Sequence, residues 1–326
     1  MTKREAIAAI GAGRMGRGIA IAFAFAGHQV HLIDIKPRSG EEFHSLNIDA
    51  TAEIRKTVSM LSEFGMLEKG EIERVLARIG CHPLDQCQSN LPHCDIVFEG
   101  VPETLEAKRS ALELISAYAR PDAIIASTTS TILSDQLQGF VTHPNRFLNA
   151  HWLNPAFLVP LVELSPGEFT AEEATSQLKE LLERIGKVPI VCRASPGYIV
   201  PRIQALAMNE AARMVEEGVA TAEDIDKATK YGFGFRFAIL GLLEFIDWGG
   251  GDILFNASNY LASATGEERY LPPQIVKDNM ANSHNGLRDK KGFLDYSELD
   301  IPKYQQQKLQ AFVAMLRHLD KIPHKG

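Results

Sequence analysis

The stretch AIAAIGAGRMGRGIAIAFAFAGHQVHLIDI, residues 6–35, decides the fold. It opens with five apolar residues, continues through a glycine-rich turn and a run of small apolar residues, and closes with a second apolar run that ends at Asp34. Short apolar runs bounded by glycine are typical of buried strands, and a longer run of small apolar residues suits a buried helix. The stretch therefore predicts a strand, a turn, a helix and a second strand, in that order.

The glycine turn GAGRMG, residues 11–16, has the spacing of a dinucleotide-binding loop. Gly11 permits the tight turn, Gly13 lets the backbone approach a diphosphate, and Gly16 lets the helix pack on the strand. The helix N-terminus then offers free N–H groups to the diphosphate. Asp34 is placed to accept hydrogen bonds from ribose hydroxyls, and its charge would repel a 2′-phosphate, which favours NAD over NADP. The alternative is a glycine-rich turn without a ligand, which the surrounding strands and acid disfavour.

The composition bounds the class of protein. The chain has 326 residues, 45% of them hydrophobic and 23% charged, which is typical of a soluble protein with two domains. A net charge of −7 argues against a nucleic-acid partner, because a phosphate backbone requires a basic face. No apolar run approaches the ~20 residues that span a bilayer, and no targeting segment is evident. We therefore expect a cytoplasmic protein without a membrane segment. We expect neither a metal site nor disulfides, because the spacings of the four cysteines match neither pattern: Cys81, Cys87, Cys94 and Cys192.

A polar, periodic segment at about residues 41–80 predicts an inserted helical hairpin, with its turn between Gly65 and Gly70. It is larger than a minimal crossover between parallel strands, so we expect it to project from the nucleotide-binding domain. It is either a packing device or a lid over a bulky substrate, with Arg55 and Lys56 as candidate contacts to substrate phosphates. Its apolar positions are Leu46, Ile48, Ile54, Val58 and Leu61 on the first helix and Ile72, Val75, Leu76 and Ile79 on the second.

The alternation of strands and helices continues after the hairpin and then stops. Strands alternating with helices imply a doubly wound parallel sheet of the Rossmann type. Beyond Pro196 the pattern changes to long apolar-periodic helices punctuated by glycine clusters at 231–234 and 249–251. We therefore expect a nucleotide-binding domain at 1–194 and an all-helical domain at 195–326. The later predicted elements are strands at 95–99, 123–127, 147–151 and 161–164, and helices at 106–119 and 198–217.

His151 ends one predicted strand and Glu163 lies in the next. A hairpin-like return would bring imidazole and carboxylate together. The carboxylate would then fix the ring tautomer and stabilise the imidazolium, leaving the other nitrogen to take a proton from a substrate hydroxyl. A histidine taken at random from the ten is more often structural, and only the acid and the adjoining Asn154–Pro155 turn single out His151. The pattern predicts a general base.

The segment HWLNP, residues 151–155, together with Glu163 resembles the histidine, asparagine-proline and glutamate pattern of the L-3-hydroxyacyl-CoA dehydrogenase family. Further segments resemble that family in the same order, so the resemblance covers nearly the whole chain. They are GAGRMG (11–16) as its nucleotide turn, EGVPE (99–103) with Lys108 as its nicotinamide-side segment, STTS (127–130) as its substrate loop, SPGY (195–198) as the entry into its helical domain, and NGLRDKKGFLDY (285–296) as its closing motif.

The resemblance implies reversible oxidation of a 3-hydroxy group to a 3-keto group, with hydride passing to NAD, short-chain acyl-CoA substrates favoured, and a place in fatty acid metabolism. It implies that His151 is the base, that Glu163 orients it, and that Ser130 donates a hydrogen bond to the substrate oxygen. Asn154 would position the substrate or the histidine loop, and the helical domain would close the cleft and form a homodimer. The implied cofactor contacts are Gly11, Gly13, Arg14, Met15, Gly16, Asp34, Glu103, Lys108 and Ser130.

Three positions depart from the family pattern. Pro201 stands where an asparagine usually helps to bind the substrate, and proline has neither a side-chain donor nor a backbone N–H. Either it sits in a first helical turn, where proline is tolerated, or the substrate differs from a simple short acyl-CoA. Arg14 replaces a commonly apolar residue and is predicted to reach the diphosphate. Arg236 is a candidate for acid recognition, or is simply stacked on its aromatic neighbours.

Three rival hypotheses remain from the sequence. The first is a dehydrogenase of a free 3-hydroxy acid, resembling L-gulonate 3-dehydrogenase and lambda-crystallin. The second is a non-catalytic NAD-binding, crystallin-like protein, which retention of both His151 and Glu163 disfavours. The third, a 3-hydroxyisobutyrate-type enzyme, lacks its catalytic-lysine and glycine-rich substrate motifs here. Acyl chain length and the presence of CoA are left open.

Overall fold

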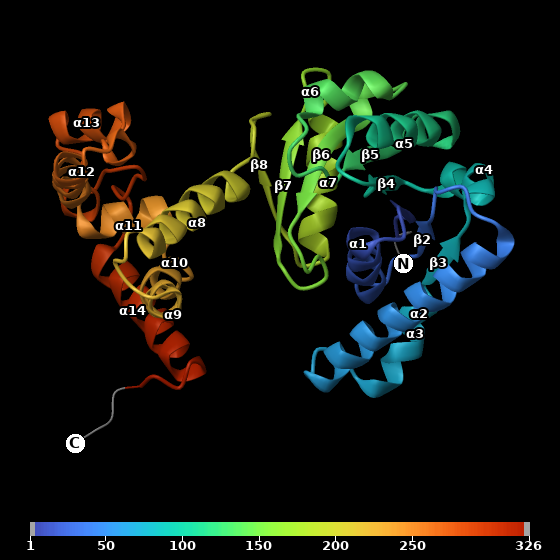
Figure 1. Ribbon diagram of the computed structural model, residues 1–326, viewed down its shortest axis with the longest axis horizontal. Coiled ribbons are helices and arrows are strands. Elements are labelled where there is room, and N and C mark those ends of the chain that lie inside the picture. The colour runs from blue at the N-terminus through green and yellow to red at the C-terminus, as the bar shows by residue number, and fades with distance from the viewer. Residues whose placement is uncertain (1–3, 323–326) are drawn as a thin grey trace. The chain divides into compact units, whose positions relative to one another are not determined.

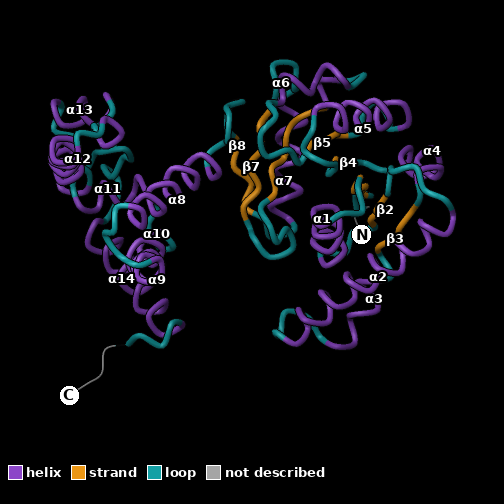
Figure 2. The backbone as a smooth tube through the Cα atoms, viewed as in Figure 1, coloured by secondary structure: helices purple, strands orange, loops and turns teal. Residues whose placement is uncertain are grey.

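The computed structural model describes residues 4–322, and the chain divides into two compact units, Met1–Ala207 and Met208–Gly326 (Figure 1). Figure 2 shows strands in the first unit and a second unit built of helices and loops. The expected Rossmann-type sheet followed by a helical domain is confirmed. The division falls within helix α8 (Val200–Glu216), later than the change of sequence pattern near Pro196.

The first unit is built on one eight-stranded sheet with the order β3-β2-β1-β4-β5-β6-β7-β8. Every neighbouring pair is parallel except β6 and β7, which run antiparallel. The return predicted between His151 and Glu163 is therefore present. The strands are β1 (Ile7–Ile10), β2 (Val30–Ile33), β3 (Ile79–His82), β4 (Ile96–Glu99), β5 (Ile124–Ser127), β6 (Phe147–Trp152), β7 (Leu161–Pro166) and β8 (Val188–Val191).

Helices cover both faces of this sheet, because its central strands are apolar on both sides. Ile7 and Ala9 belong to one core cluster with residues of α1, α2 and α7, whereas Ala8 and Ile10 belong to a second cluster with residues of α4, α5 and α6. The helices are α1 (Arg14–Phe25), α2 (Gly40–Glu63), α3 (Ile72–Leu76), α4 (Cys87–Asn90), α5 (Leu105–Tyr118), α6 (Ser134–Leu137) and α7 (Glu172–Arg184).

The predicted hairpin is present as α2 and α3, but its second arm is shorter than expected. Ile79 was expected on the helix and instead begins β3, which pairs with β2 at the edge of the sheet. The long arm starts at a capping box in which Ser39 and Glu42 satisfy each other's backbone N–H groups. Ile54 and Val58 are buried in the cluster that contains α1, so the hairpin is packed along part of its length.

The second unit is helical, and its glycine clusters act in different ways. Gly250 has φ +110° and separates α11 from α12, as expected of a break. Gly232 and Gly234 instead lie in a π-helical turn, Thr229–Gly234, that runs directly from α9 into α10. The helices are α9 (Ala222–Ala228), α10 (Phe235–Phe237), α11 (Leu242–Gly249), α12 (Gly251–Thr265), α13 (Gln274–Ala281) and α14 (Ile301–His318).

Among residues 4–322, no helix combines the length and the apolar character that crossing a bilayer requires.

Candidate active site

The antiparallel pairing of β6 and β7 places His151 directly opposite Glu163. His151 Nδ1 lies 2.8 Å from Glu163 Oε2, and both residues are buried, with 4% and 0% of their surfaces exposed. A carboxylate in this position holds the imidazole with Nδ1 protonated, so that Nε2 carries the free lone pair. The arrangement orients an imidazole whose free nitrogen can accept a proton.

The second oxygen of Glu163 is also engaged. Oε1 accepts the backbone N–H groups of Ile199 and Val200, each at 2.9 Å, at the start of α8. Burial by itself would raise the pKa of Glu163, but the hydrogen bonds from His151, Val200 and Ile199 hold that pKa below its usual value. Glu163 is therefore a charged acceptor that links the imidazole of His151 to the next helix.

Tyr198 is a site residue to which the sequence assigned no role. Its ring stacks on His151 with centroids 5.0 Å apart and planes 3° from parallel. Its hydroxyl donates to the Thr129 carbonyl at 2.9 Å and accepts from Asn149 Nδ2 at 3.0 Å. Tyr198 has φ 44°, a left-handed conformation that is uncommon for a residue with a side chain. It therefore connects the imidazole to the segment before Ser130.

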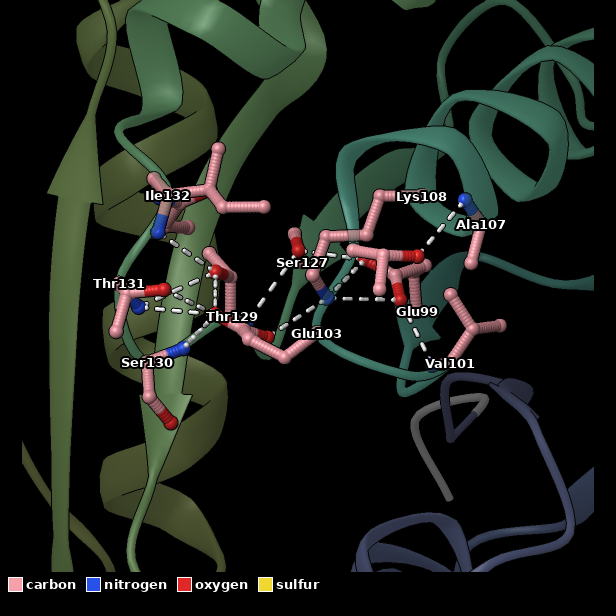
Figure 3. A network of polar contacts seen from close by, with 12 residues as sticks. Glu99, Val101, Glu103, Ala107, Lys108, Ser127, Thr129, Ser130, Thr131 and Ile132 are labelled. Atoms are coloured by element: carbon pink, nitrogen blue, oxygen red, sulfur yellow. Dashed lines mark hydrogen bonds and ion pairs between the residues drawn. The ribbon is translucent and has the colours of Figure 1, made fainter.

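The loop after β5 is organised around Glu103, as Figure 3 shows. Glu103 Oε1 accepts the backbone N–H groups of Ser130 and Thr131 at 2.9 Å each and the hydroxyl of Thr129. Burial raises the pKa of Glu103, but the Thr129 hydroxyl, Lys108 and Thr131 outweigh it and lower that pKa. The hydroxyl of Ser130 points away from this network in Figure 3 and is exposed, so it is available to a ligand.

Lys108 lies at the back of the same network. Its side chain is fully buried, and Nζ contacts both oxygens of Glu99 at 3.2 Å and Glu103 at 3.4 Å. The sequence predicts that Lys108 touches the cofactor, and that contact stays a prediction. In the structure the ammonium holds two carboxylates in place, so its visible role is to position Glu103.

Residues 11–13 of the glycine turn line a groove of about 610 Å³, together with Asp34 and Gly100. A Cβ built on Gly11 would come within 2.8 Å of the Gly100 carbonyl, and one built on Gly16 within 2.0 Å of the Gly11 carbonyl. Gly13 faces open space, and no side chain caps the start of α1. These features fit a dinucleotide, whose diphosphate needs close backbone approach and free N–H groups.

Asp34 is buried, and its Oδ2 accepts from Arg38 Nε at 2.6 Å. Both side chains line the groove. The guanidinium holds the carboxylate just beyond the end of β2, where the ribose of a bound dinucleotide would lie. Arg38 is thus an orienting partner of Asp34 that the glycine motif alone did not reveal.

Lys187 holds the loop between β6 and β7 through hydrogen bonds to its backbone. This ammonium donates to the carbonyls of Ala156 at 2.7 Å and Val159 at 2.8 Å, and it lies 5.4 Å from the Trp152 ring centre. Only 8% of Lys187 is exposed, and burial lowers its pKa to about 8. Asn154, the motif asparagine, is an exposed residue of this loop.

We expect Lys187→Met to change how stability depends on pH. In the folded protein Lys187 loses its proton at a pH near 8, whereas an unfolded lysine keeps it to a pH near 10.4. The unfolded chain binds more protons over that range, so this residue makes the free energy of unfolding rise with pH. Urea unfolding at several pH values between 7.5 and 10 should show a steeper rise for the wild type than for Lys187→Met. Parallel curves would contradict the assignment.

Several predicted contacts lie elsewhere. Arg55 and Lys56 are exposed on α2, and Arg55 Nη2 pairs with Glu73 Oε2 of α3 at 3.0 Å. Pro201 is the second residue of α8, the first-turn position where proline is tolerated. Arg236 bonds the Gly232 carbonyl at 3.0 Å and lies over the Phe245 ring at 4.9 Å, both within the second unit.

Arg14 and Met15 differ in their surroundings. Met15 is half-buried against the core cluster beneath α1. Arg14 is exposed and lines a second cavity beside the Asn154 loop, whereas the cofactor groove is lined by Arg17. The predicted contact between Arg14 and a diphosphate stays a prediction. Within residues 4–322, no group of three or more His, Cys, Asp and Glu side chains is arranged to hold a metal ion.

Comparison with known families covers both parts of the chain. Residues 6–195 match the NAD binding domain of 3-hydroxyacyl-CoA dehydrogenase, and residues 197–296 match the C-terminal domain of the same family. A 3-hydroxyacyl-CoA dehydrogenase structure from Archaeoglobus fulgidus is similar with a TM-score of 0.77 and 30% identity, covering 98% of this chain and 100% of that one.

Similar curated proteins differ in the substrates that their names give. A 5-formyl-3-hydroxy-2-methylpyridine 4-carboxylate 5-dehydrogenase from Mesorhizobium japonicum is 28% identical over 96% of this chain and 98% of its own length. A lambda-crystallin homolog from Bos taurus is 37% identical over 73% of this chain and 72% of its own length. With a groove that fits NAD, a buried histidine and glutamate pair, and a family match from the first strand to Tyr296, this NAD-dependent oxidoreductase belongs to the 3-hydroxyacyl-CoA dehydrogenase family.

Proposed function

We propose that the protein oxidises the 3-hydroxy group of a short-chain L-3-hydroxyacyl-CoA to a 3-keto group, reversibly, with His151 as the general base. The observation that carries the proposal is the 2.8 Å contact between His151 Nδ1 and Glu163 Oε2 in a buried site. It leaves Nε2 as the acceptor for the hydroxyl proton. Bound NAD supplies the acceptor for the hydride that leaves the carbon.

Three side chains of the protein have separate roles in the proposed reaction: proton acceptance, charge stabilisation and hydrogen-bond donation. His151 takes the hydroxyl proton at Nε2, and Glu163 stabilises the resulting imidazolium without itself taking a proton. The Ser130 hydroxyl faces away from its loop's internal hydrogen bonds and donates to the developing carbonyl oxygen. Glu103 fixes the backbone of that loop, so the donor needs no rearrangement during the reaction.

The direct test is a substrate panel followed at the NADH absorbance. L-3-hydroxybutyryl-CoA and longer thioesters would be compared with free 3-hydroxy acids at one NAD concentration. The proposal expects the highest kcat/KM for a short thioester. If the protein binds NAD but oxidises no 3-hydroxy compound in the panel, the rival of a non-catalytic NAD-binding protein is favoured.

A second candidate is a dehydrogenase of a free 3-hydroxy acid. It is supported by the similarity to a lambda-crystallin homolog and to a dehydrogenase named for a pyridine carboxylate. His151 and Glu163 would accept the hydroxyl proton, Ser130 would bond the oxygen and NAD would accept the hydride in both cases, so the two candidates differ only in what recognises the rest of the substrate. A higher kcat/KM for a free acid than for every thioester would select this candidate.

The Tyr198 hydroxyl offers a prediction about positioning. Tyr198→Phe keeps the ring on His151 but leaves the Thr129 carbonyl without its donor. We expect the free energy of unfolding to fall by about 1–2 kcal/mol and kcat to fall roughly tenfold, since the loop bearing Ser130 is less well placed. KM for NAD should not change. Unfolding and steady-state kinetics on the same preparation would check this, and a loss of stability with kcat unchanged would make the hydroxyl merely structural.

We also propose that the protein is a homodimer located in the cytoplasm. Helices α8, α9 and α14 bury no residue in the single chain, although α8 and α14 are amphipathic and carry large apolar side chains such as Leu206, Met208 and Leu309 that are exposed. Amphipathic helices are stable when their apolar stripe is covered, and a second copy would cover it. Sedimentation equilibrium should give twice the chain mass.

The proposed location in the cytoplasm is supported by the cysteines. All four are unpaired, as expected in a reducing compartment.

A further inference from the structure

Asn149 is a fully buried polar residue of β6, two positions before His151. Side chains alternate between the two faces of a strand, so Asn149 and His151 leave the sheet on the same face. The neighbouring residues fit this alternation, because Leu148 and Ala150 belong to the core cluster on the opposite face. The sequence assigns Asn149 no role. A buried amide is costly unless it is hydrogen-bonded, so the contacts of Asn149 indicate what it does.

The amide nitrogen of Asn149 uses both of its hydrogens. Nδ2 donates to the Ile132 carbonyl at 2.9 Å and to the Tyr198 hydroxyl at 3.0 Å. Ile132 lies two residues after Ser130, and the Tyr198 ring stacks on His151. One side chain therefore contacts both the segment that carries the proposed hydrogen-bond donor and the ring that lies against the proposed base.

Residues 128–132 form a loop that we call the donor loop, because it carries Ser130. Glu103 accepts two of its backbone N–H groups, whereas Asn149 and Tyr198 each donate to one of its carbonyls. All five backbone N–H groups of the loop donate to acceptors within the protein. The loop therefore offers a substrate oxygen the side chain of Ser130 rather than a backbone N–H. The place of that hydroxyl depends on how the loop backbone is held.

Asn149 ties the donor loop to the strand that carries His151. In the proposed reaction the Ser130 hydroxyl and His151 Nε2 meet the same substrate oxygen, so the distance between these two groups affects the rate. The ladder with β7 fixes His151, and the Asn149 side chain holds the donor loop against the same strand. The Tyr198 hydroxyl, which accepts from Asn149, makes a second link by donating to the Thr129 carbonyl.

We propose that Asn149 is a positioning residue that sets the distance between the Ser130 hydroxyl and His151. This inference rests on the proposed 3-hydroxy oxidation and adds to it a residue that acts through Ser130. Asn149 is fully buried, so it acts through these two residues and not by touching the substrate. An asparagine meets the requirement because a single atom, Nδ2, carries two hydrogens, whereas an aspartate of the same shape carries none when ionised.

The principal test is a double-mutant cycle of Asn149→Asp and Ser130→Ala. We expect Asn149→Asp to lower kcat about tenfold, because the Ile132 carbonyl loses its donor and the donor loop is less well placed. KM for NAD should not change, since Asn149 does not line the cofactor groove. In the Ser130→Ala background the same change should lower kcat by less than about twofold, because there is no hydroxyl left to position.

Two further variants separate positioning from folding. Asn149→Ala removes the amide without adding a charge, and it should reproduce the loss of kcat and its dependence on Ser130. Asn145→Asp makes the same chemical change at an exposed position outside the site, and it should keep the kcat of the wild type. An equal loss of kcat with and without the Ser130 hydroxyl would overturn the inference, and so would a rise in KM for NAD that accompanies the loss.

Hydrogen exchange tests the same contacts without turnover. The amide hydrogens of residues 128–132 should exchange about tenfold faster in Asn149→Ala than in the wild type, the effect of losing one hydrogen bond that holds the loop. Those of β1 should exchange at the same rate in both proteins. If the wild type oxidises no 3-hydroxy compound, the proposed function fails while this measurement still decides the role of Asn149. Equal exchange of residues 128–132 in the two proteins would reject that role.

Discussion

His151→Gln is expected to lower kcat by roughly 10²–10⁴-fold, the usual contribution of a positioned general base. The imidazole is the group in the site whose free nitrogen can take the hydroxyl proton, since its Nδ1 already faces Glu163. Glutamine retains a hydrogen-bonding side chain of similar length but does not accept a proton near neutral pH. The measurement is steady-state oxidation of the best substrate from the panel, together with NAD binding followed by calorimetry.

The controls for His151→Gln separate chemistry from folding. NAD affinity should be unchanged, since the cofactor groove does not include His151. His143→Gln, at an exposed position outside both cavities of the active-site region, should keep full activity. Substantial turnover by His151→Gln with intact NAD binding would mean that another group accepts the proton.

Glu163→Gln is expected to lower kcat on a similar scale, roughly 10²–10⁴-fold, for a reason specific to this site. Glu163 accepts hydrogen bonds at both oxygens, from His151 at one and from Ile199 and Val200 at the other. An amide has one oxygen, and the two backbone donors are expected to capture it. The amide NH₂ then faces His151 Nδ1, which forces the tautomer with the proton on Nε2 and blocks the base.

The readout for Glu163→Gln includes the pH dependence of stability. The pKa of Glu163 lies below its usual value in the folded protein, so its charge stabilises the fold at pH values above about 4.3. That contribution is lost as the pH falls through the lowered pKa. Urea unfolding between pH 3 and 7 should show the wild type more stable than the variant at pH 7 and the difference shrinking toward pH 3. A constant difference would indicate that Glu163 is not charged in the fold.

The local parts of the fold were predictable because their signals lie within a few residues. The spacing of the glycine turn and Asp34 predicts that both lie at one site, and both line the same groove in the structure. The sequence predicts helix at the start of strand β3, because Ile79 continues the apolar periodicity of the preceding turn. Strand β8 gave no signal, since it is an edge strand with exposed apolar residues and contains Pro189.

The sequence predicted only those residues of the candidate site that belong to a recognisable sequence pattern. His151 and Glu163 were predictable because an imidazole and a carboxylate lie on two predicted strands that the Asn154–Pro155 turn joins. Tyr198 and Lys187 were not, because their contacts join segments distant in the chain and neither residue type is unusual at its position. A buried lysine is recognisable only when the carbonyls around it are known, and a stacked tyrosine only when the sheet has placed the imidazole.

The antiparallel ladder of β6 and β7 makes the register of the His151 and Glu163 pair independent of the segment that connects the two strands. The ladder fixes the register of His151 and Glu163 through backbone hydrogen bonds on both sides of the pair. The segment from Leu153 to Pro160 closes that ladder without contributing to its register, and its shape is held separately, by Lys187 at the carbonyls of Ala156 and Val159. Side chains of this segment that make no such contact can therefore be exchanged while the register of His151 and Glu163 is unaltered.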